Sequence, residues 1–418
     1  MYALSLKKIF VNTALLLAGL FFGLIIVENL AGYYLKKSTL GRKIAYIDDK
    51  SVSPFRYRFS YKQSDRELGC SLKAGTEDTF ISSEFTVIYS INSHGRRDKE
   101  IPLEKPKGEF RILALGESTV FGEGVNYGKR LTEIIEQALG NVEVINMGVP
   151  GFGLDQSFLY LKRNGFQFNP DVVVIFIFFP DYLDRCMDIT GPGSTTVKPR
   201  FILSKDRNGL MLQDTEHIRK EFESEISPQE SNTVRTSEAA DGKSKIQNHK
   251  IRISYSNALT LINYYAKKQK IDKAIRSADT KFLNNVFEII SWQYKRRERY
   301  KREDFKRLIF LLIVEYQKIC SEHNVDLAFI NMSTARLGSV ERACKALKIP
   351  YLDLSKIITR ASQSEKLDFP INRHFNDIYH RIVGEYVSDY LRKRYNLKGN
   401  SNYLYKYLGK FGSGENYE

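Results

Sequence analysis

Cysteine and histidine are scarce in this chain of 418 residues, and neither shows a ligand spacing. The four cysteines lie far apart with no Cys-x-x-Cys pair, which excludes a disulfide scaffold and argues against a zinc–thiolate site. The six histidines form neither an HExxH nor an HxH pattern, so we expect no metal site and no cofactor. Apolar residues make up 42% of the chain, enough for a sizeable core, which excludes wholesale disorder.

Acidic residues are outnumbered by basic ones, 49 against 64, and the net charge is therefore +15. The excess gathers between Lys250 and Phe310, which hold 16 basic and 6 acidic residues and include the dense run Lys295–Arg307. A solvated helix face explains such a run, and contact with a membrane surface or an acidic polymer is the alternative. Nucleic acid is not an expected partner, because no aromatic-basic recognition motif accompanies the charge.

One long apolar run is present, from Ile9 to Val27, and only Asn12 and Thr13 interrupt it. Its 19 residues match the roughly 20 that a helix needs to cross the hydrocarbon core of a bilayer. A cleaved signal peptide has a shorter apolar region followed by a site of small residues, which this sequence lacks. We therefore predict an uncleaved transmembrane anchor within residues 1–35. Residues 36–83 are polar and form either a stalk or the edge of the folded body.

From residue 84 the pattern alternates between short apolar strands and amphipathic helices. Continuous apolar strands separated by helices predict a mainly parallel sheet covered on both faces. The expected α/β domain spans 84–395, a basic and partly disordered insertion interrupts it at about 187–302, and 396–418 is a tail. The strands are expected at 84–91, 111–115, 142–147, 171–178, 325–331 and 350–354, and the helices at 129–139, 155–164, 304–322, 335–347 and 377–394.

Polar residues follow three of the predicted strands. Ligands of parallel sheets bind at the carboxyl ends of the strands, where Ser118, Gly148 and Asp181 lie. Serine is a weak nucleophile until a base takes its proton, and His374 precedes the last helix at a position from which it can reach Ser118. From spacing alone, Ser–His catalysis and an ordinary helix cap beside a surface histidine both remain open.

Four sequence blocks resemble those of the SGNH/GDSL hydrolase superfamily, and they occur in the family's order. The resemblance covers about 84–183 and 304–394 and implies a flavodoxin-like, three-layer α/β/α fold. A lead-in at Ile91–Arg97 (INSHGRR) is similar to that of bacterial-envelope members. The blocks are Ile112–Val125 (ILALGESTVFGEGV), Val144–Gln156 (VINMGVPGFGLDQ), Val173–Asp181 (VVIFIFFPD) and His374–Val383 (HFNDIYHRIV).

The resemblance assigns roles to individual residues. It implies that Ser118 is the nucleophile and His374 its base. The N–H groups of Ser118 and Gly148 are then oxyanion donors, a kind of contact that can each contribute about 10²–10³ in rate. His380 is expected to be a helix-surface or packing residue, and Asp155 a helix cap.

Three positions depart from the family pattern. Pro180 stands where the third block has its asparagine, which leaves Asp181 as a possible substitute. The acid that precedes the histidine is replaced by Asn372, unless the more distant Asp368 folds back to it. Glu117 replaces the aspartate that usually precedes the serine.

The sequence therefore predicts a membrane-anchored serine ester hydrolase or O-acyltransferase that acts on an acylated envelope glycan or lipid. The flanking charges, two lysines before the anchor and four basic residues after it, favour a cytoplasmic body by count. The family resemblance favours the opposite side, and we expect the body in the periplasm or at the cell surface. The alternative is a catalytically degenerate SGNH-fold protein that binds glycan or serves as a membrane scaffold.

Overall fold

The computed structural model describes the folded body of the chain. The predicted anchor, the disorder-prone part of the insertion and Pro180 lie outside the described residues. No helix within the described part is both long and apolar enough to cross a membrane. The described residues are 61–81, 84–178, 181–188, 197–218, 220, 302–370, 372 and 374–412.

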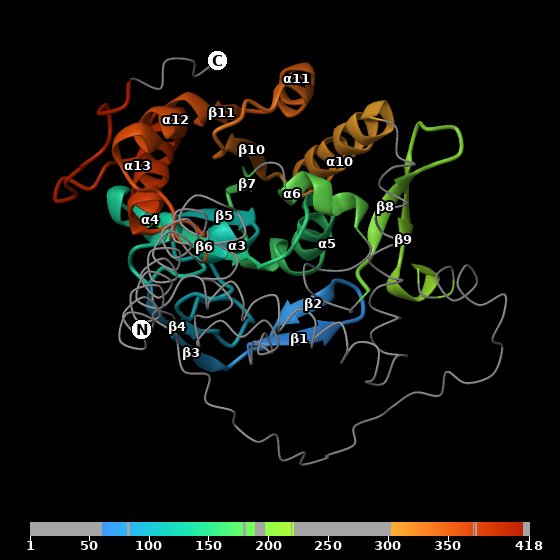
Figure 1. Cartoon of the computed structure of the whole chain (residues 1–418), viewed down its shortest axis with the longest axis horizontal. Helices are drawn as coiled ribbons and strands as arrows, with labels where there is room; N and C mark the ends of the chain where they lie inside the picture. The colour runs from blue at the N-terminus through green and yellow to red at the C-terminus, as the bar shows by residue number, and fades with distance from the viewer. Residues whose placement is uncertain are drawn as a thin grey trace, which may run out of the picture. The chain divides into compact units, whose positions relative to one another are not determined.

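A parallel five-stranded sheet forms the centre of the domain (Figure 1). The strands lie in the order β11-β10-β7-β5-β6, so that from the β6 edge their chain order is 2-1-3-4-5, as in flavodoxin-like sheets. The predicted parallel sheet is thus confirmed. Its strands are β5 (Phe110–Gly116), β6 (Val142–Gly148), β7 (Val172–Ile177), β10 (Asp326–Asn331) and β11 (Tyr351–Asp353).

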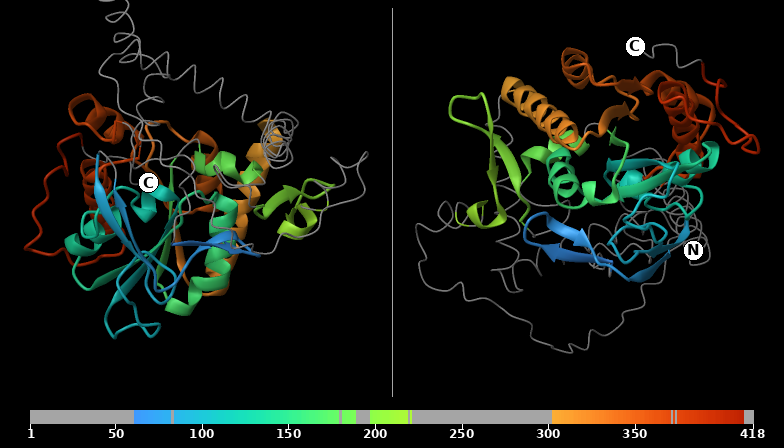
Figure 2. Two further views of the ribbon diagram at one scale, coloured as in Figure 1. Left: turned by 60° about the horizontal axis from the view of Figure 1, so that its bottom comes forward. Right: turned by 180° about the vertical axis from the view of Figure 1, so that it is seen from behind.

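Helices cover both faces of this sheet (Figures 1 and 2). Successive strand residues point to opposite faces, and they divide accordingly between two apolar clusters. Leu113, Val173 and Ile175 pack with α5, α10 and α11, whereas Ala114 and Val174 pack with α4, α12 and α13. The helices are α4 (Leu131–Ala138), α5 (Leu154–Asn164), α10 (Arg302–Glu322), α11 (Gly338–Leu347), α12 (Ser355–Ser364) and α13 (Asp377–Arg394), with shorter turns α3 (Ser118–Phe121), α6 (Asp181–Asp184), η1 (Phe166–Phe168) and η2 (Arg185–Met187).

Two antiparallel hairpins precede the sheet in the chain. They pair β1 (Lys62–Asp65) with β2 (Gly69–Leu72) and β3 (Glu77–Ile81) with β4 (Thr86–Ser90). Tyr61, Leu68 and Leu72 are buried in the core, so the described residues of the stretch left open as stalk or edge belong to the body. The strand predicted at 84–91 is β4, which pairs with β3 outside the parallel sheet, whereas the sequence pattern missed β1, β2 and β3, which are short.

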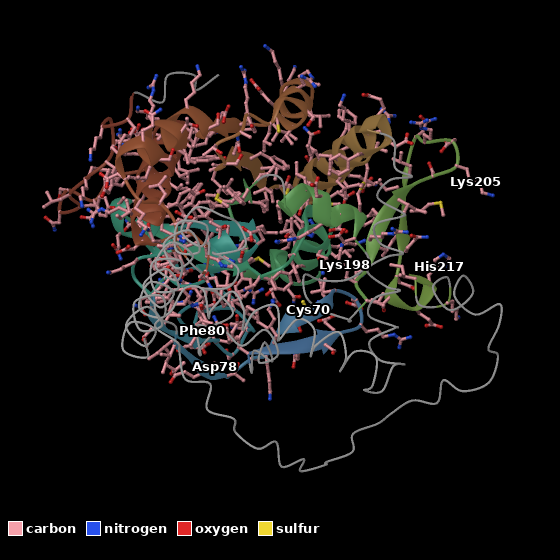
Figure 3. All side chains as sticks on the ribbon, viewed as in Figure 1. Cys70, Asp78, Phe80, Lys198, Lys205 and His217 are labelled. Atoms are coloured by element: carbon pink, nitrogen blue, oxygen red, sulfur yellow. The ribbon has the colours of Figure 1, made fainter. Side chains whose placement is uncertain are left out.

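The described part of the predicted insertion also packs on the domain. It contains a hairpin of β8 (Arg200–Leu203) and β9 (Leu210–Gln213). Just before it lies Lys198, which is labelled in Figure 3. Its Nζ is 2.7 Å from Asp155 Oδ2, and both side chains are almost fully buried. Asp155 is therefore an ion-pair partner, and the predicted cap is wrong because Gly153 occupies the cap position of α5. The tail packs as well, since Tyr407 and Phe411 are buried.

Candidate active site

Ser118 begins the short helix α3, directly after β5 ends at Gly116. Two glycines let this helix lie against the ends of the strands. A Cβ atom on Gly116 would stand 2.4 Å from Val120 Cγ2, and one on Gly148 would stand 2.3 Å from the Phe121 nitrogen. No side chain fits at either position without moving the turn that carries Ser118, so the spacing of these glycines fixes where the hydroxyl emerges.

The Gly148 N–H, which the family resemblance makes an oxyanion donor, has a partner within the protein. It donates to Asn146 Oδ1 at 2.9 Å, while Asn146 Nδ2 donates to the Val120 carbonyl at 2.7 Å. Asn146 thereby ties the end of β6 to the helix that carries Ser118. The Gly148 N–H can bind an oxyanion only by exchanging this partner, and the sequence blocks gave no sign of that constraint.

His374 lies beside Ser118, as the sequence predicts. Its Nε2 is 3.1 Å from Ser118 Oγ, and its Nδ1 is 2.6 Å from Asn372 Oδ1. Because an amide oxygen accepts hydrogen bonds, Nδ1 carries the proton and Nε2 presents its lone pair to the serine hydroxyl. Asn372 occupies the place beside Nδ1, whereas the backbone of Asp368 bridges to Phe375.

Glu117 is a buried carboxylate in contact with the nucleophile. It accepts hydrogen bonds from the Ser118 hydroxyl and from the Thr119 N–H, the latter at 3.0 Å. Burial raises the pKa of Glu117, but Arg185, 3.7 Å away, and the two neighbouring hydroxyls outweigh that effect and hold the pKa below its usual value. The single proton of the Ser118 hydroxyl therefore has two acceptors within reach, the neutral His374 Nε2 and the charged Glu117 carboxylate, and it is donated to one of them at a time.

Glu123 is a second carboxylate at the site, and the sequence analysis assigned it no role. Its Oε2 lies 3.3 Å from His374 Nε2, and its side chain is only 10% exposed. Gly122 and Gly124 have φ angles of 80° and 83°, left-handed values that favour glycine, and they turn the chain back toward Ser118. The available signal was the Gly-Glu-Gly spacing within the first block.

A residue of the lead-in motif Ile91–Arg97 holds the turn at Gly122–Gly124 in place through hydrogen bonds. Arg97 is buried and donates to the carbonyls of Phe121 and Val125, at 3.0 and 2.7 Å. Burial, reinforced by the charge of nearby Arg130, lowers the pKa of Arg97 to about 9. Its guanidinium also lies 4.5 Å from the centre of the Tyr89 ring, so cation–π contact adds to the backbone contacts.

The segment after β7 brings a cation to the site. Asp181 begins α6, but its side chain is outside the described part of the chain. Arg185 follows, with Nη1 3.7 Å from Glu117 Oε2 and 3.3 Å from the Phe152 carbonyl. No sequence signal marked Arg185, because the strand–helix pattern breaks off at this point.

His380 lies away from the nucleophile, and the sequence analysis expected it to be a surface or packing residue. His380 is buried in α13, where its Nδ1 accepts the Leu131 N–H at 3.1 Å. Burial lowers its pKa to about 3, so it is a neutral packing residue, as one of its two predicted roles requires.

Within the described ranges, no group of three or more His, Cys, Asp or Glu side chains is placed to hold a metal ion.

Comparisons with known proteins found distant structural likenesses. No family model and no curated protein matches the chain. A two-domain esterase active on acetylated mannans is similar at 10% identity and a TM-score of 0.33 over 71% of this chain, which spans about half (52%) of that protein. A lipase/acylhydrolase from Enterococcus faecalis is similar at 14% identity and a TM-score of 0.29, over 70% of this chain and 99% of that one. The resemblance to the SGNH/GDSL hydrolases rests on the ordered sequence blocks, and the contact between Ser118 and His374 agrees with it.

Proposed function

We propose that the protein is a serine ester hydrolase with an SGNH-type fold, or an O-acyltransferase that uses the same acyl-enzyme chemistry. The observation that carries the proposal is the 3.1 Å contact between Ser118 Oγ and His374 Nε2 at the carboxyl edge of the sheet. A nucleophile and base within hydrogen-bond reach, with the base oriented by a third group, is the arrangement that activates serine. Turnover of an acyl ester by the purified protein tests it.

The reaction follows from this geometry in two steps. His374 Nε2 takes the Ser118 proton while Oγ attacks the acyl carbonyl, and the resulting imidazolium returns that proton to the departing alcohol. Water, or a sugar hydroxyl in a transferase, then gives its proton to His374 and attacks the acyl-serine. The His374 imidazolium returns that proton to Ser118 Oγ as the C–O bond to the serine breaks, which releases the acid or the new ester and restores the serine hydroxyl and the neutral base.

Glu123 supplies the negative charge that Asn372 lacks. Asn372 fixes the histidine tautomer, but a neutral amide does little to stabilise the imidazolium that forms during the reaction. The Glu123 carboxylate, 3.3 Å from Nε2, favours the charged ring because opposite charges at this distance attract strongly in a buried site. Glu117 adds negative charge on the serine side.

Arg185 compensates for the missing asparagine of the third block. It is the guanidinium beside Glu117 and comes from the chain segment where that asparagine would lie. A fixed positive charge close to the developing oxyanion lowers the barrier in a site shielded from water. The Gly148 N–H joins it when it exchanges Asn146 Oδ1 for the oxyanion.

Glu123→Gln tests the proposed electrostatic role. We expect kcat/KM for an acyl ester to fall by about 10–10²-fold, because the imidazolium loses its neighbouring charge. The double variant Glu123→Gln/Asn372→Asp should recover part of the rate lost in Glu123→Gln, because it places a carboxylate beside Nδ1 of His374.

The matched control for this experiment is Glu341→Gln, which removes an acid on α11 that pairs with Arg336. This variant should keep the wild-type rate. A wild-type kcat/KM in Glu123→Gln would show that the Glu123 charge does not assist the reaction.

The predicted anchor and family resemblance support an acylated glycan or lipid of the cell envelope as substrate, with the body outside the cytoplasm. A reporter enzyme fused after Glu418 checks the side of the membrane. We expect activity only from a reporter that folds outside the cytoplasm. Activity only from a cytoplasmic reporter would overturn the location and would move the substrate to the inner side of the membrane.

A glycan-binding protein without turnover is the second candidate. Two observations favour it, the Gly148 N–H held by Asn146 and the amide in place of the usual acid beside His374. It predicts that the wild-type protein binds acylated glycan and hydrolyses no acyl ester. Measured turnover that depends on Ser118 excludes this candidate.

A further inference from the structure

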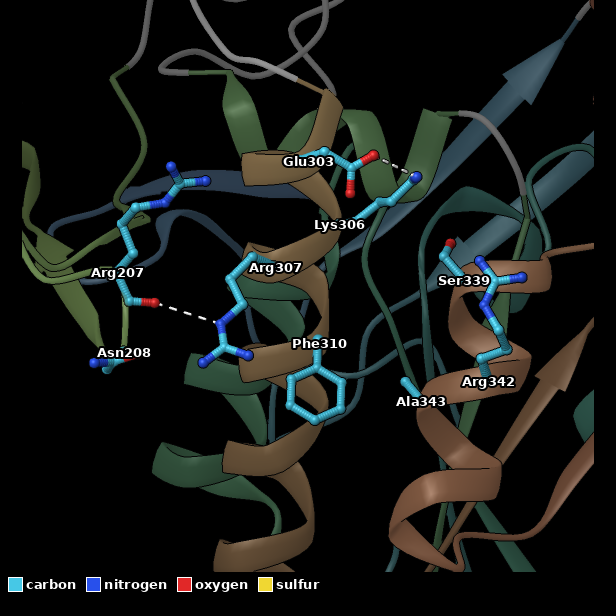
Figure 4. A pocket seen from close by; sticks show the side chains of 9 residues that line it. All are labelled: Arg207, Asn208, Glu303, Lys306, Arg307, Phe310, Ser339, Arg342 and Ala343. Carbon is cyan, nitrogen blue, oxygen red and sulfur yellow. Dashed lines mark hydrogen bonds and ion pairs between the residues drawn. The ribbon is translucent and has the colours of Figure 1, made fainter.

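A cavity of about 500 Å³ opens between the hairpin β8–β9, the first turns of α10 and the start of α11 (Figure 4). Its lining is basic, although one apolar ring and one hydroxyl also contribute. The basic run singled out in the sequence ends here, so two of its last residues line the cavity. The main lining residues are Arg207, Lys306, Arg307, Phe310, Ser339 and Arg342.

The charges around this cavity are only partly balanced. Lys306 pairs with Glu303 at 2.7 Å, and Arg207 pairs with Asp304. For Arg307 and Arg342, by contrast, no described carboxylate lies within ion-pair distance, and Arg307 donates only to a backbone carbonyl at 3.4 Å. Two guanidinium groups therefore line the cavity with no described carboxylate in direct contact, although Glu303 lines the cavity beside Lys306 and Glu341 on α11 lies close enough to Arg342 to sense its charge.

The start of α11 adds to the excess of positive charge. No side chain caps this helix at Leu337, and the first N–H groups of a helix have no partner within it. A terminal guanidinium nitrogen of Arg342 lies 3.3 Å from where a Cβ atom on Gly338 would stand, so the cation folds back over the positive end of its own helix. A cation at that end is unfavourable, and the acid of the first turn, Glu341, is already paired with Arg336, so a bound anion would relieve the remaining positive charge.

The cavity opens on the same edge of the sheet as the nucleophile. In a parallel sheet, helices run back against the strands that they connect. Because α10 precedes β10 and α11 follows it, both helices begin at the carboxyl edge, where β5 delivers Ser118. An extended substrate can therefore contact the cavity and Ser118 along one edge.

We propose that this cavity binds an anionic group, a phosphate or carboxylate, on the glycan whose acyl ester reaches Ser118. The inference rests on the proposed function and narrows its substrate to acidic glycans. Guanidinium groups match both anions in charge and geometry. The half-buried Phe310 ring offers an apolar face to the sugar that carries the charge.

The test compares an acetylated oligosaccharide that carries a uronate with its acetylated neutral counterpart. Wild-type protein should show the higher kcat/KM on the acidic substrate. In the double variant Arg307→Ala/Arg342→Ala, the ratio of acidic to neutral kcat/KM should fall by about tenfold or more, because two charge-assisted contacts are lost. Arg66→Ala is the control, since its guanidinium pairs with Glu216 and does not line the cavity.

Binding measurements separate the failure of this inference from failure of the proposed function. Calorimetry with the deacetylated acidic oligosaccharide should show binding that the double variant loses, even if no ester is turned over. Ester turnover with an unchanged acidic-to-neutral ratio would overturn the acidic-glycan proposal and leave the hydrolase intact. A protein that binds inorganic phosphate or anionic lipid vesicles but does not bind the acidic oligosaccharide would also overturn the proposal. The cavity would then be assigned to the ligand that binds.

Discussion

Replacing Ser118 or His374 with alanine should reduce ester turnover by about 10³-fold or more in each single variant. The double variant should be no slower than either single variant, because the two side chains act as one unit. Without His374, the imidazole that takes the serine proton is missing. Without Ser118, the imidazole has no nucleophile to activate. The measurement is kcat/KM on an acyl ester for the wild type and the three variants.

Folding must be checked before these rates are compared. Ser118 and His374 lie at the ends of elements that stay intact, so the far-ultraviolet circular dichroism of each variant should match that of the wild type. Turnover that survives Ser118→Ala at the wild-type rate would show that the chemistry lies elsewhere in the chain. A double variant much slower than both single variants would mean that the two residues act independently.

Replacing Lys198 with alanine should cost the domain about 3–5 kcal/mol in free energy of unfolding, because it leaves the Asp155 carboxylate buried without its partner. The pair joins the start of the β8–β9 hairpin to the first turn of α5. Chemical denaturation monitored by circular dichroism measures the loss.

The double variant Lys198→Met/Asp155→Leu distinguishes the buried charge from lost packing. It removes both charges and keeps apolar volume, so it should recover most of the lost stability. A double variant as unstable as Lys198→Ala would show that the ion pair itself holds the hairpin in place. A Lys198→Ala protein of wild-type stability would contradict the buried-charge argument altogether.

The sheet and its covering helices could be predicted because burial on both faces leaves a strong pattern in the sequence. The strand Val172–Ile177 is apolar throughout, Phe110–Gly116 is apolar apart from Arg111, and α13 begins and ends at the predicted residues. Of the first two hairpins only β4, within the strand predicted at 84–91, left a recognisable pattern. Their strands bury only scattered side chains, and their fixed positions come from contacts with the finished sheet.

The candidate site likewise contains some residues that could be predicted from the sequence and others that could not. Ser118 and His374 could be predicted because strand ends and a block motif identify them. Glu123 could not, because its place beside His374 depends on two left-handed glycines that fold the chain back after α3. The partner of the Gly148 N–H was equally hidden, since it depends on the side-chain orientation of Asn146.

The central claim is that Ser118 is an activated nucleophile. Treating the purified full-length protein with a serine-directed fluorophosphonate probe, followed by peptide mass spectrometry, tests it most directly. The account predicts a single covalent label on Ser118, absent in Ser118→Ala and formed far more slowly in His374→Ala. No label on the folded wild-type protein, or a label on another serine with Ser118 unmodified, would contradict it.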